Sequence, residues 1–173
     1  MTAPSKGGRI QSVAVDGAPK AAPVAERGAA PPVATAAPGS RDQGGRLLVL
    51  VVERDPHIRE LESHFLEQAG YAIEFASDGK AALELARSIR PDVVITEILV
   101  PRLDGLALCR ALKADPATSG ISVLIFSILA ASARAKEAGA DAFLSKPLAD
   151  RRLVGTVQSL LEKRQRRQPK EPT

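Results

Sequence analysis

The sequence is poor in aromatic residues and has a single cysteine. Of its 173 residues only 3% are aromatic, so a hydrophobic core must consist mainly of Val, Ile, Leu and Ala. Cys109 alone excludes an internal disulfide framework and zinc sites of the CxxC type. No apolar run reaches the roughly 20 residues of a membrane-spanning helix, and the N-terminus has no apolar segment of a secretory signal. We therefore expect a cytoplasmic protein without a membrane segment.

The positive charge lies mostly towards the two ends of the chain. The whole sequence has a formal net charge of +4, of which residues 1–45 contribute +2 and residues 161–173 contribute +3, while residues 46–160 carry −1. A central part with almost no net charge is unlike the basic surface of a nucleic-acid-binding domain. We do not expect nucleic-acid binding there, and the basic ends leave it open as an alternative.

Composition divides the chain into three parts. Residues 1–45 hold six of the 13 prolines and seven of the 13 glycines, without helical or strand periodicity, so we predict a disordered extension rich in Ala, Pro and Gly. Residues 46–161 have the apolar content of one folded domain. Residues 162–173 are predicted to be a basic C-terminal tail.

Apolar runs and helical spacings alternate along the central part. The runs predict five strands, at residues 47–52, 71–76, 93–95, 121–126 and 142–144. Helices are predicted from Asp55-Pro56, from Asp78-Gly79, over 103–114, as a short helix over 130–138, and from Ala149. Such alternation is typical of a parallel sheet with helices on both faces, whose working site lies at the carboxyl ends of the strands. The polar residues at these ends are Glu53, Arg54, Glu97, Ser127 and Lys146.

Six short motifs, in order, resemble the receiver domains of bacterial two-component response regulators, the CheY-like superfamily. They are Val51-Val52-Glu53-Arg54-Asp55-Pro56, Ser77-Asp78-Gly79-Lys80-Ala81-Ala82-Leu83, Pro91-Asp92-Val93-Val94-Ile95, Val100-Pro101-Arg102-Leu103-Asp104-Gly105, Ala138-Gly139-Ala140-Asp141 and Lys146-Pro147. The resemblance implies an α/β, flavodoxin-like (βα)5 fold, with a five-strand parallel sheet in the order 2-1-3-4-5. It also implies a cis peptide bond between Lys146 and Pro147.

The resemblance assigns a role to each polar position. Glu97 stands at the phosphoacceptor position, and Glu53 and Arg54 stand at the acidic pair that helps to bind Mg²⁺. Ser127 and Lys146 correspond to the residues that contact the phosphoryl group. Phe143 corresponds to the aromatic residue that changes position on activation.

Two of these positions depart from the family pattern. Glu97 replaces an aspartate and moves the carboxylate outward by about 1.5 Å, in a reaction that depends on in-line positioning. Arg54 replaces an acid with a cation that has no acceptor for a metal. Counting Glu53 and Glu97 against Arg54 and Lys146, we expect a formally neutral pocket without a metal, in which Arg54 or Lys146 pairs with Glu97.

We therefore expect a pseudo-receiver with no catalytic activity and no cofactor. Glu97 either leaves the pocket silent or imitates a phosphorylated aspartate; a phosphorylatable, Mg²⁺-dependent switch is the competing hypothesis. Few residues follow the last predicted helix, so we expect a stand-alone domain that signals through protein contact, with a histidine kinase or another pathway component among its partners. The shortened segment 128–138 is expected to give either a short helix packed onto the sheet or an altered docking face.

Overall fold

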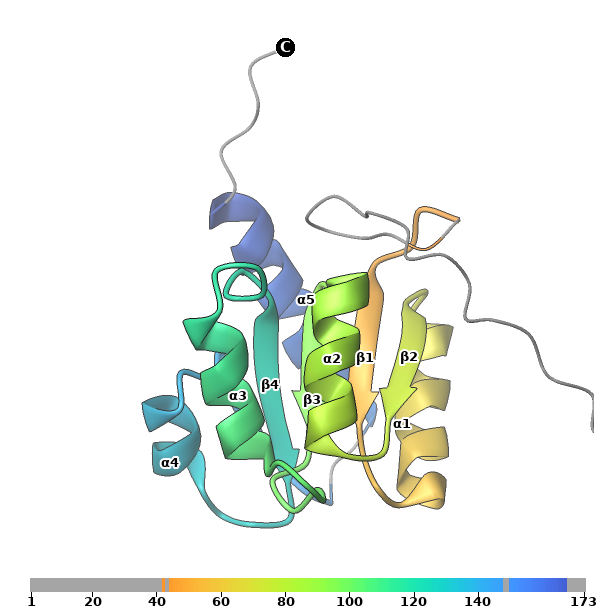
Figure 1. Ribbon diagram of the computed structural model, residues 1–173. Coiled ribbons are helices and arrows are strands. Elements are labelled where there is room, and N and C mark those ends of the chain that lie inside the picture. The colour runs from red at the N-terminus through yellow and green to blue at the C-terminus, as the bar shows by residue number, and fades with distance from the viewer. Residues whose placement is uncertain (1–41, 43, 148–149, 168–173) are drawn as a thin grey trace, which may run out of the picture. The chain divides into compact units, whose positions relative to one another are not determined.

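The computed structural model describes residues 42, 44–147 and 150–167. Within this part, five strands alternate with five helices (Figure 1). The strands are β1 Leu48–Val52, β2 Ala72–Ala76, β3 Val93–Thr96, β4 Ser122–Ser127 and β5 Ala142–Ser145. The helices are α1 Pro56–Gln68, α2 Gly79–Ile89, α3 Gly105–Ala114, α4 Ser132–Glu137 and α5 Asp150–Arg167. The predicted alternation is confirmed, whereas nearly all of the predicted disordered extension lies outside the described residues.

The five strands form one parallel sheet in the order β2-β1-β3-β4-β5. Every residue of β1, β3 and β4 is buried, as expected for uninterrupted apolar strands that are covered on both faces. The α/β fold class and the strand order implied by the resemblance are therefore confirmed. The carboxyl ends of the strands share one edge of the sheet, the lower edge in Figure 1.

Two apolar clusters attach the helices to the two faces of the sheet. One cluster joins the sheet to Leu66 of α1 and to Leu153 and Val157 of α5. The other contains Ala86 of α2 and Leu108 of α3, together with Ala135 of the short α4. The result is a three-layer α/β/α arrangement in which α1 and α5 cover one face of the sheet.

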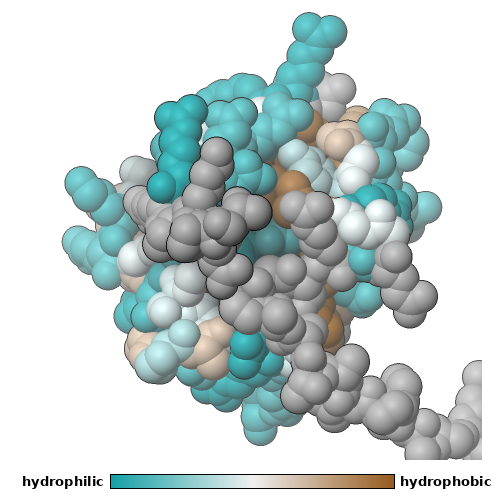
Figure 2. All heavy atoms as spheres, turned by 90° about the horizontal axis from the view of Figure 1, so that it is seen from above, coloured by the Kyte–Doolittle hydropathy of each residue, from teal (hydrophilic) through white to brown (hydrophobic). Residues whose placement is uncertain are grey.

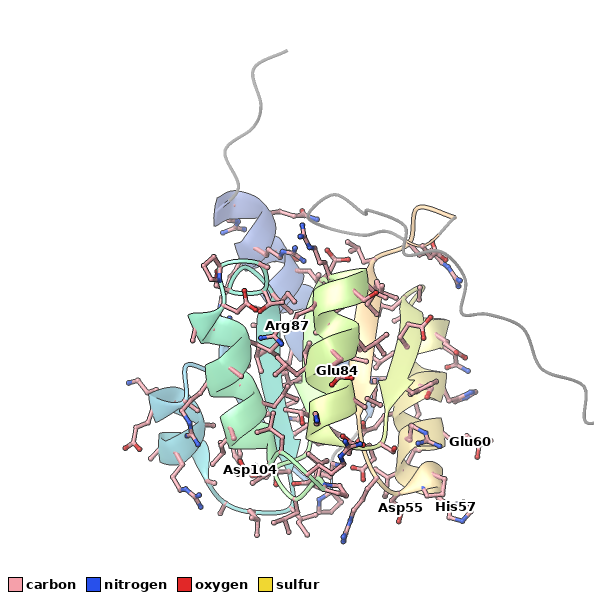
Figure 3. The ribbon with its side chains drawn as sticks, viewed as in Figure 1. Asp55, His57, Glu60, Glu84, Arg87 and Asp104 are labelled. Carbon is pink, nitrogen blue, oxygen red and sulfur yellow. The ribbon has the colours of Figure 1, made fainter. Side chains whose placement is uncertain are left out.

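Aspartate caps fix the starts of the helices beside the carboxyl edge. Asp55 accepts hydrogen bonds from His57 N (2.9 Å) and Ile58 N (3.4 Å), and Asp104 accepts from Leu106 N and Ala107 N (2.9 Å each). Figure 3 shows both caps at the same end of the layers. The predicted N-cap at Asp55 is therefore confirmed.

The last helix continues into the predicted basic tail. The expected tail began at residue 162, but α5 continues to Arg167. Arg164 Nη1 lies 2.6 Å from Asp92 Oδ1, and the two side chains are only 13% and 8% exposed. This largely buried ion pair anchors the end of α5 to the start of β3.

The face at the amino ends of the strands is polar. Figure 2 views this face, and the residues coloured there are mostly hydrophilic. None of the helices in the described part is long and apolar enough to cross a membrane.

Candidate functional site

Four of the predicted site residues meet at the carboxyl edge of the sheet. Glu53 and Glu97 directly follow β1 and β3, Ser127 ends β4, and Lys146 follows β5. Glu53, Glu97 and Ser127 are 4%, 7% and 0% exposed. Lys146 Nζ lies 2.6 Å from Glu53 Oε2 and 3.6 Å from Glu97 Oε2. The topology therefore brings these side chains together, as the sequence predicts.

The Glu97 carboxylate is held by donors of its own loop and of β4. Oε1 accepts hydrogen bonds from Ile98 N (2.6 Å) and from the Ser127 hydroxyl, and Oε2 accepts one from Ile128 N (3.3 Å). Gly105 packs so closely on the Glu97 carbonyl that a Cβ there would collide with it. The side chain and its backbone are thus both fixed by neighbouring groups.

Sequence reasoning missed a third buried acid, Glu62 of α1. Its side chain is 6% exposed, and its Oε1 lies 3.0 Å from Lys146 Nζ. Ile58, Leu61, Phe65, Leu66 and Ala69 mark the face of α1 that was expected to be apolar. An acid inside that stripe was the available signal, because a buried carboxylate needs a partner.

The charges at this site perturb each other. Burial, opposed by the attraction of Lys146 and assisted by the charges of Glu53 and Glu97, raises the pKa of Glu62 to about 7. Burial acts to lower the pKa of Lys146, but attraction to Glu62 and hydrogen bonding with Glu53 outweigh it, so that this pKa lies above its ordinary value. Lys146 Nζ also lies 4.8 Å from the centroid of the Phe126 ring. We conclude that Lys146 remains an ammonium ion held between carboxylates.

The expected charge balance of the pocket was wrong. Arg54 is exposed, and no ion pair joins it to Glu97 within the described part of the chain. The chain bends at Arg54 directly after β1, and this side chain is exposed whereas that of Glu53 is buried. The buried set is Glu53, Glu62 and Glu97 against Lys146, a formal −2 with every acid ionised, instead of zero. Of Arg54 and Lys146, the two alternatives for the partner of Glu97, Lys146 is the one that lies near it, at 3.6 Å.

Comparisons with known proteins identify the family. The family model described as the response regulator receiver domain matches residues 49–158. The chain belongs to this family. It is thus a receiver domain of the kind used in two-component signalling, and its fold and the order of its motifs agree with that membership.

Similar proteins support the same assignment. The receiver is 38% identical over 116 residues to the response regulator MprA of Mycolicibacterium vanbaalenii, covering 66% of this chain and 50% of that protein. It is 32% identical over 121 residues to the DNA-binding dual master transcriptional regulator RpaA of Synechocystis, covering 68% and 50%. A receiver domain of a signal transduction histidine kinase from Syntrophus aciditrophicus aligns with a TM-score of 0.66 and 36% identity, covering 73% of this chain and 97% of that one. The chain spans about half the length of the curated relatives it matches.

The donors present in this receiver do not suit Mg²⁺. The ion prefers several oxygen ligands in a tight octahedron. Glu53 Oε2 bonds to Lys146, its Oε1 accepts from Asp55 N at 2.9 Å, and Arg54 supplies no acceptor. No cluster of three or more potential metal ligands occurs within residues 44–147 and 150–167. The described residues therefore do not form the oxygen-rich cage that this ion needs.

The remaining predicted features lie beside the pocket. Phe143 of β5 is half-buried and packs against the cluster under α3 and α4. The Lys146–Pro147 peptide bond is cis, as the resemblance implied. The short α4 buries Ala135 completely. Of the two alternatives for this segment, a short helix packed onto the sheet is therefore the one that agrees with the structure.

Proposed function

We propose that this receiver domain acts in two-component signalling without being phosphorylated, through contact with a protein partner. The observation that carries the proposal is the way the Glu97 carboxylate is engaged. Its two oxygens bond to the Ser127 hydroxyl and to Ile98 N and Ile128 N. An acceptor carboxylate needs a free oxygen aligned with the incoming phosphorus, and here both oxygens already have donors.

The neighbours of Glu97 support the same conclusion. Lys146, which the family resemblance places on the phosphoryl group, is nearer to Glu53 (2.6 Å) and Glu62 (3.0 Å) than to Glu97 (3.6 Å). An incoming phosphate would meet three buried carboxylates without the divalent cation that normally offsets such charge. Phosphorylation of Glu97 is therefore disfavoured by geometry and by charge together.

Within this proposal, Glu97 imitates the phosphorylated state. The resemblance assigns the Ser127 hydroxyl and the Lys146 ammonium to the phosphoryl group, and the Glu97 carboxylate has a contact with each of them. A receiver held in this way has a constant output surface, formed by α4, β5 and α5. A histidine kinase or another pathway component is the class of partner we propose for that surface. A silent pocket is the competing interpretation.

A titration followed by amide NMR tests the absence of phosphorylation. The chain is titrated with Mg²⁺ and then with beryllofluoride, which imitates a phosphoryl group on a carboxylate. We expect the amide signals of Glu53, Glu97, Ser127 and Lys146 to stay in place. Saturable, Mg²⁺-dependent shifts of these signals would overturn the proposal.

The substitution Glu97→Ala separates mimicry from silence. If Glu97 holds an active-like state, its removal will shift the amides of Ser127, Ile128 and Phe143, the last being on the proposed output surface. A silent pocket predicts shifts confined to the groups that contact Glu97, at the end of β3 and at Ser127 and Ile128, so that Phe143 is the signal that decides. Glu84→Gln, an exposed change on α2 (Figure 3), is the matched control and should leave Phe143 unmoved.

Nucleic-acid binding is a second candidate function. It is favoured by the name of the RpaA relative, which calls that protein DNA-binding, and by the +3 charge of residues 161–173. Binding through phosphates would weaken steeply with salt. We expect no such binding for a chain shortened after Leu161, and salt-dependent affinity of that shortened chain would place the activity in the receiver itself.

A further inference from the structure

An apolar pocket opens between α1 and α5, next to the carboxylate site. Its volume is about 280 Å³, and its walls include Ile58, Leu61 and Phe65 of α1, Phe126 of β4 and Leu153 of α5. Small-molecule sites are mostly apolar with a few placed polar groups, and this volume is close to the lower end of their range. The pocket therefore has the lining and size for a small organic molecule.

Apolar side chains also gather at the mouth of this pocket. Ile58, Leu61 and Ile128 are 36%, 53% and 64% exposed, and they are three of the five large hydrophobic side chains exposed in the described part of the chain. Single exposed hydrophobic residues are ordinary, whereas several around one opening indicate a binding surface. The opening thus offers an apolar path to the interior.

The pocket has a charged floor. Glu62 and Lys146 both line it, and Glu62 is only 5% exposed. The buried Glu62 Oε1 lies 3.0 Å from Lys146 Nζ, an ion-pair contact that does not have the alignment of a hydrogen bond, and no other donor among the described residues reaches it. A buried acceptor that lacks an aligned donor destabilises the protein. A donor entering through the pocket would remove that destabilisation.

Charge selects the kind of donor. Behind Glu62 lie Glu53 and Glu97, and Lys146 is the only cation in ion-pair contact with these three acids within the described part of the chain. Its ammonium is closest to Glu53, at 2.6 Å, which leaves the Glu62 carboxylate the least satisfied of the three. The floor is therefore complementary to a positive head group and repels an anion.

We infer that this pocket binds a small organic cation, with an ammonium or amidinium group donating to Glu62 and an aromatic or branched aliphatic body between α1 and α5. The inference does not depend on the absence of phosphorylation, because neither Glu97 nor a metal contacts the ligand. A ligand bound here would contact both α1 and the start of α5.

Three matched probes test the inference on the full chain by amide NMR titration. They are phenethylamine, 2-phenylethanol and phenylacetate, which share an aromatic body and differ in head group. We expect saturable shifts at Ile58, Leu61, Ile128 and Lys146 with the amine, at least tenfold weaker binding of the alcohol, and no binding of the acid. Equal binding of amine and acid, or no saturable shift with the amine, would overturn the inference.

Three variants test whether the probes bind in this pocket and whether the substituted protein still folds. Glu62→Gln should weaken amine binding at least tenfold and leave the alcohol unaffected, while Ile128→Ser, at an exposed position, should weaken both probes equally. Glu60→Gln is the matched control, since Glu60 projects from α1 into solvent (Figure 3). Unchanged amine binding in both Glu62→Gln and Ile128→Ser would refute the assignment to this pocket.

Discussion

Replacing Glu62 by glutamine should remove a pH dependence of stability that the buried carboxylate creates. Burial raises the pKa of Glu62 in the folded protein to about 7, against an ordinary value of 4.5. The folded state therefore holds this proton more tightly than the unfolded chain does. Between these two values the unfolded chain releases the proton first, so the free energy of unfolding falls as pH rises.

The size of the effect follows from the two pKa values. The full difference corresponds to about 3 kcal/mol, of which about 2 kcal/mol is lost between about pH 5 and about pH 8. Lys146 adds no slope in this window, because its pKa lies above an ordinary value of 10.5. Glutamine keeps the shape of the side chain and cannot titrate. The difference in stability between Glu62→Gln and the parent should therefore change by about 2 kcal/mol across the window, in favour of the variant at high pH.

Urea unfolding at several pH values measures this difference directly, because the midpoint and slope give the free energy of unfolding. A constant offset between the two proteins reports packing and hydrogen bonding, so only the pH-dependent part is compared. Glu60→Gln, on the exposed side of the same helix, should follow the parent at every pH. Parallel pH profiles for Glu62→Gln and the parent would refute a buried, perturbed carboxylate at position 62.

Two further predictions concern the ends of the sheet. Arg164→Met breaks the ion pair with Asp92 and should lower the free energy of unfolding by about 3 kcal/mol. The double variant Arg164→Met with Asp92→Asn should lose less stability, because it leaves no charge unpaired. Equal losses of stability in urea unfolding would contradict a coupled pair. Arg54→Asp with Glu97→Asp should show only a weak response to Mg²⁺ and beryllofluoride by NMR, and adding Glu62→Leu should strengthen it by releasing Lys146. A triple variant as unresponsive as the parent would show that Glu62 does not control the lysine.

The parts of the structure that the sequence predicted are those governed by local patterns. Each strand appeared as an apolar run, and Asp55 and Asp78 marked helix starts because their side chains cap the first turn. The convergence of Glu53, Glu97, Ser127 and Lys146 followed from topology, since parallel strands end at one edge. Periodicity and chain direction were sufficient for these features.

The parts that the sequence did not predict depend on side-chain direction and on contacts between distant segments. Arg54 was counted in the pocket because it follows Glu53, but the chain bends there and leaves its side chain exposed. Glu62 was not singled out in the sequence, although its side chain lies 3.0 Å from Lys146. The extent of α5 depends on Arg164 meeting Asp92, 72 residues away along the chain.

The two acids that sequence reasoning treated differently, Glu97 and Glu62, act on the same lysine. A lysine between three carboxylates cannot follow one of them without leaving another buried charge unpaired, and such a loss costs several kcal/mol. In an ordinary switch the lysine must be free to meet the incoming phosphoryl group. Here Glu62 and Glu53 hold it within 3.0 Å and 2.6 Å, so any movement towards Glu97 weakens two shorter contacts to improve one longer contact. Glu62 in α1 thus competes with Glu97 at the end of β3 for the same ammonium, which supports the proposal of a receiver with one state rather than two.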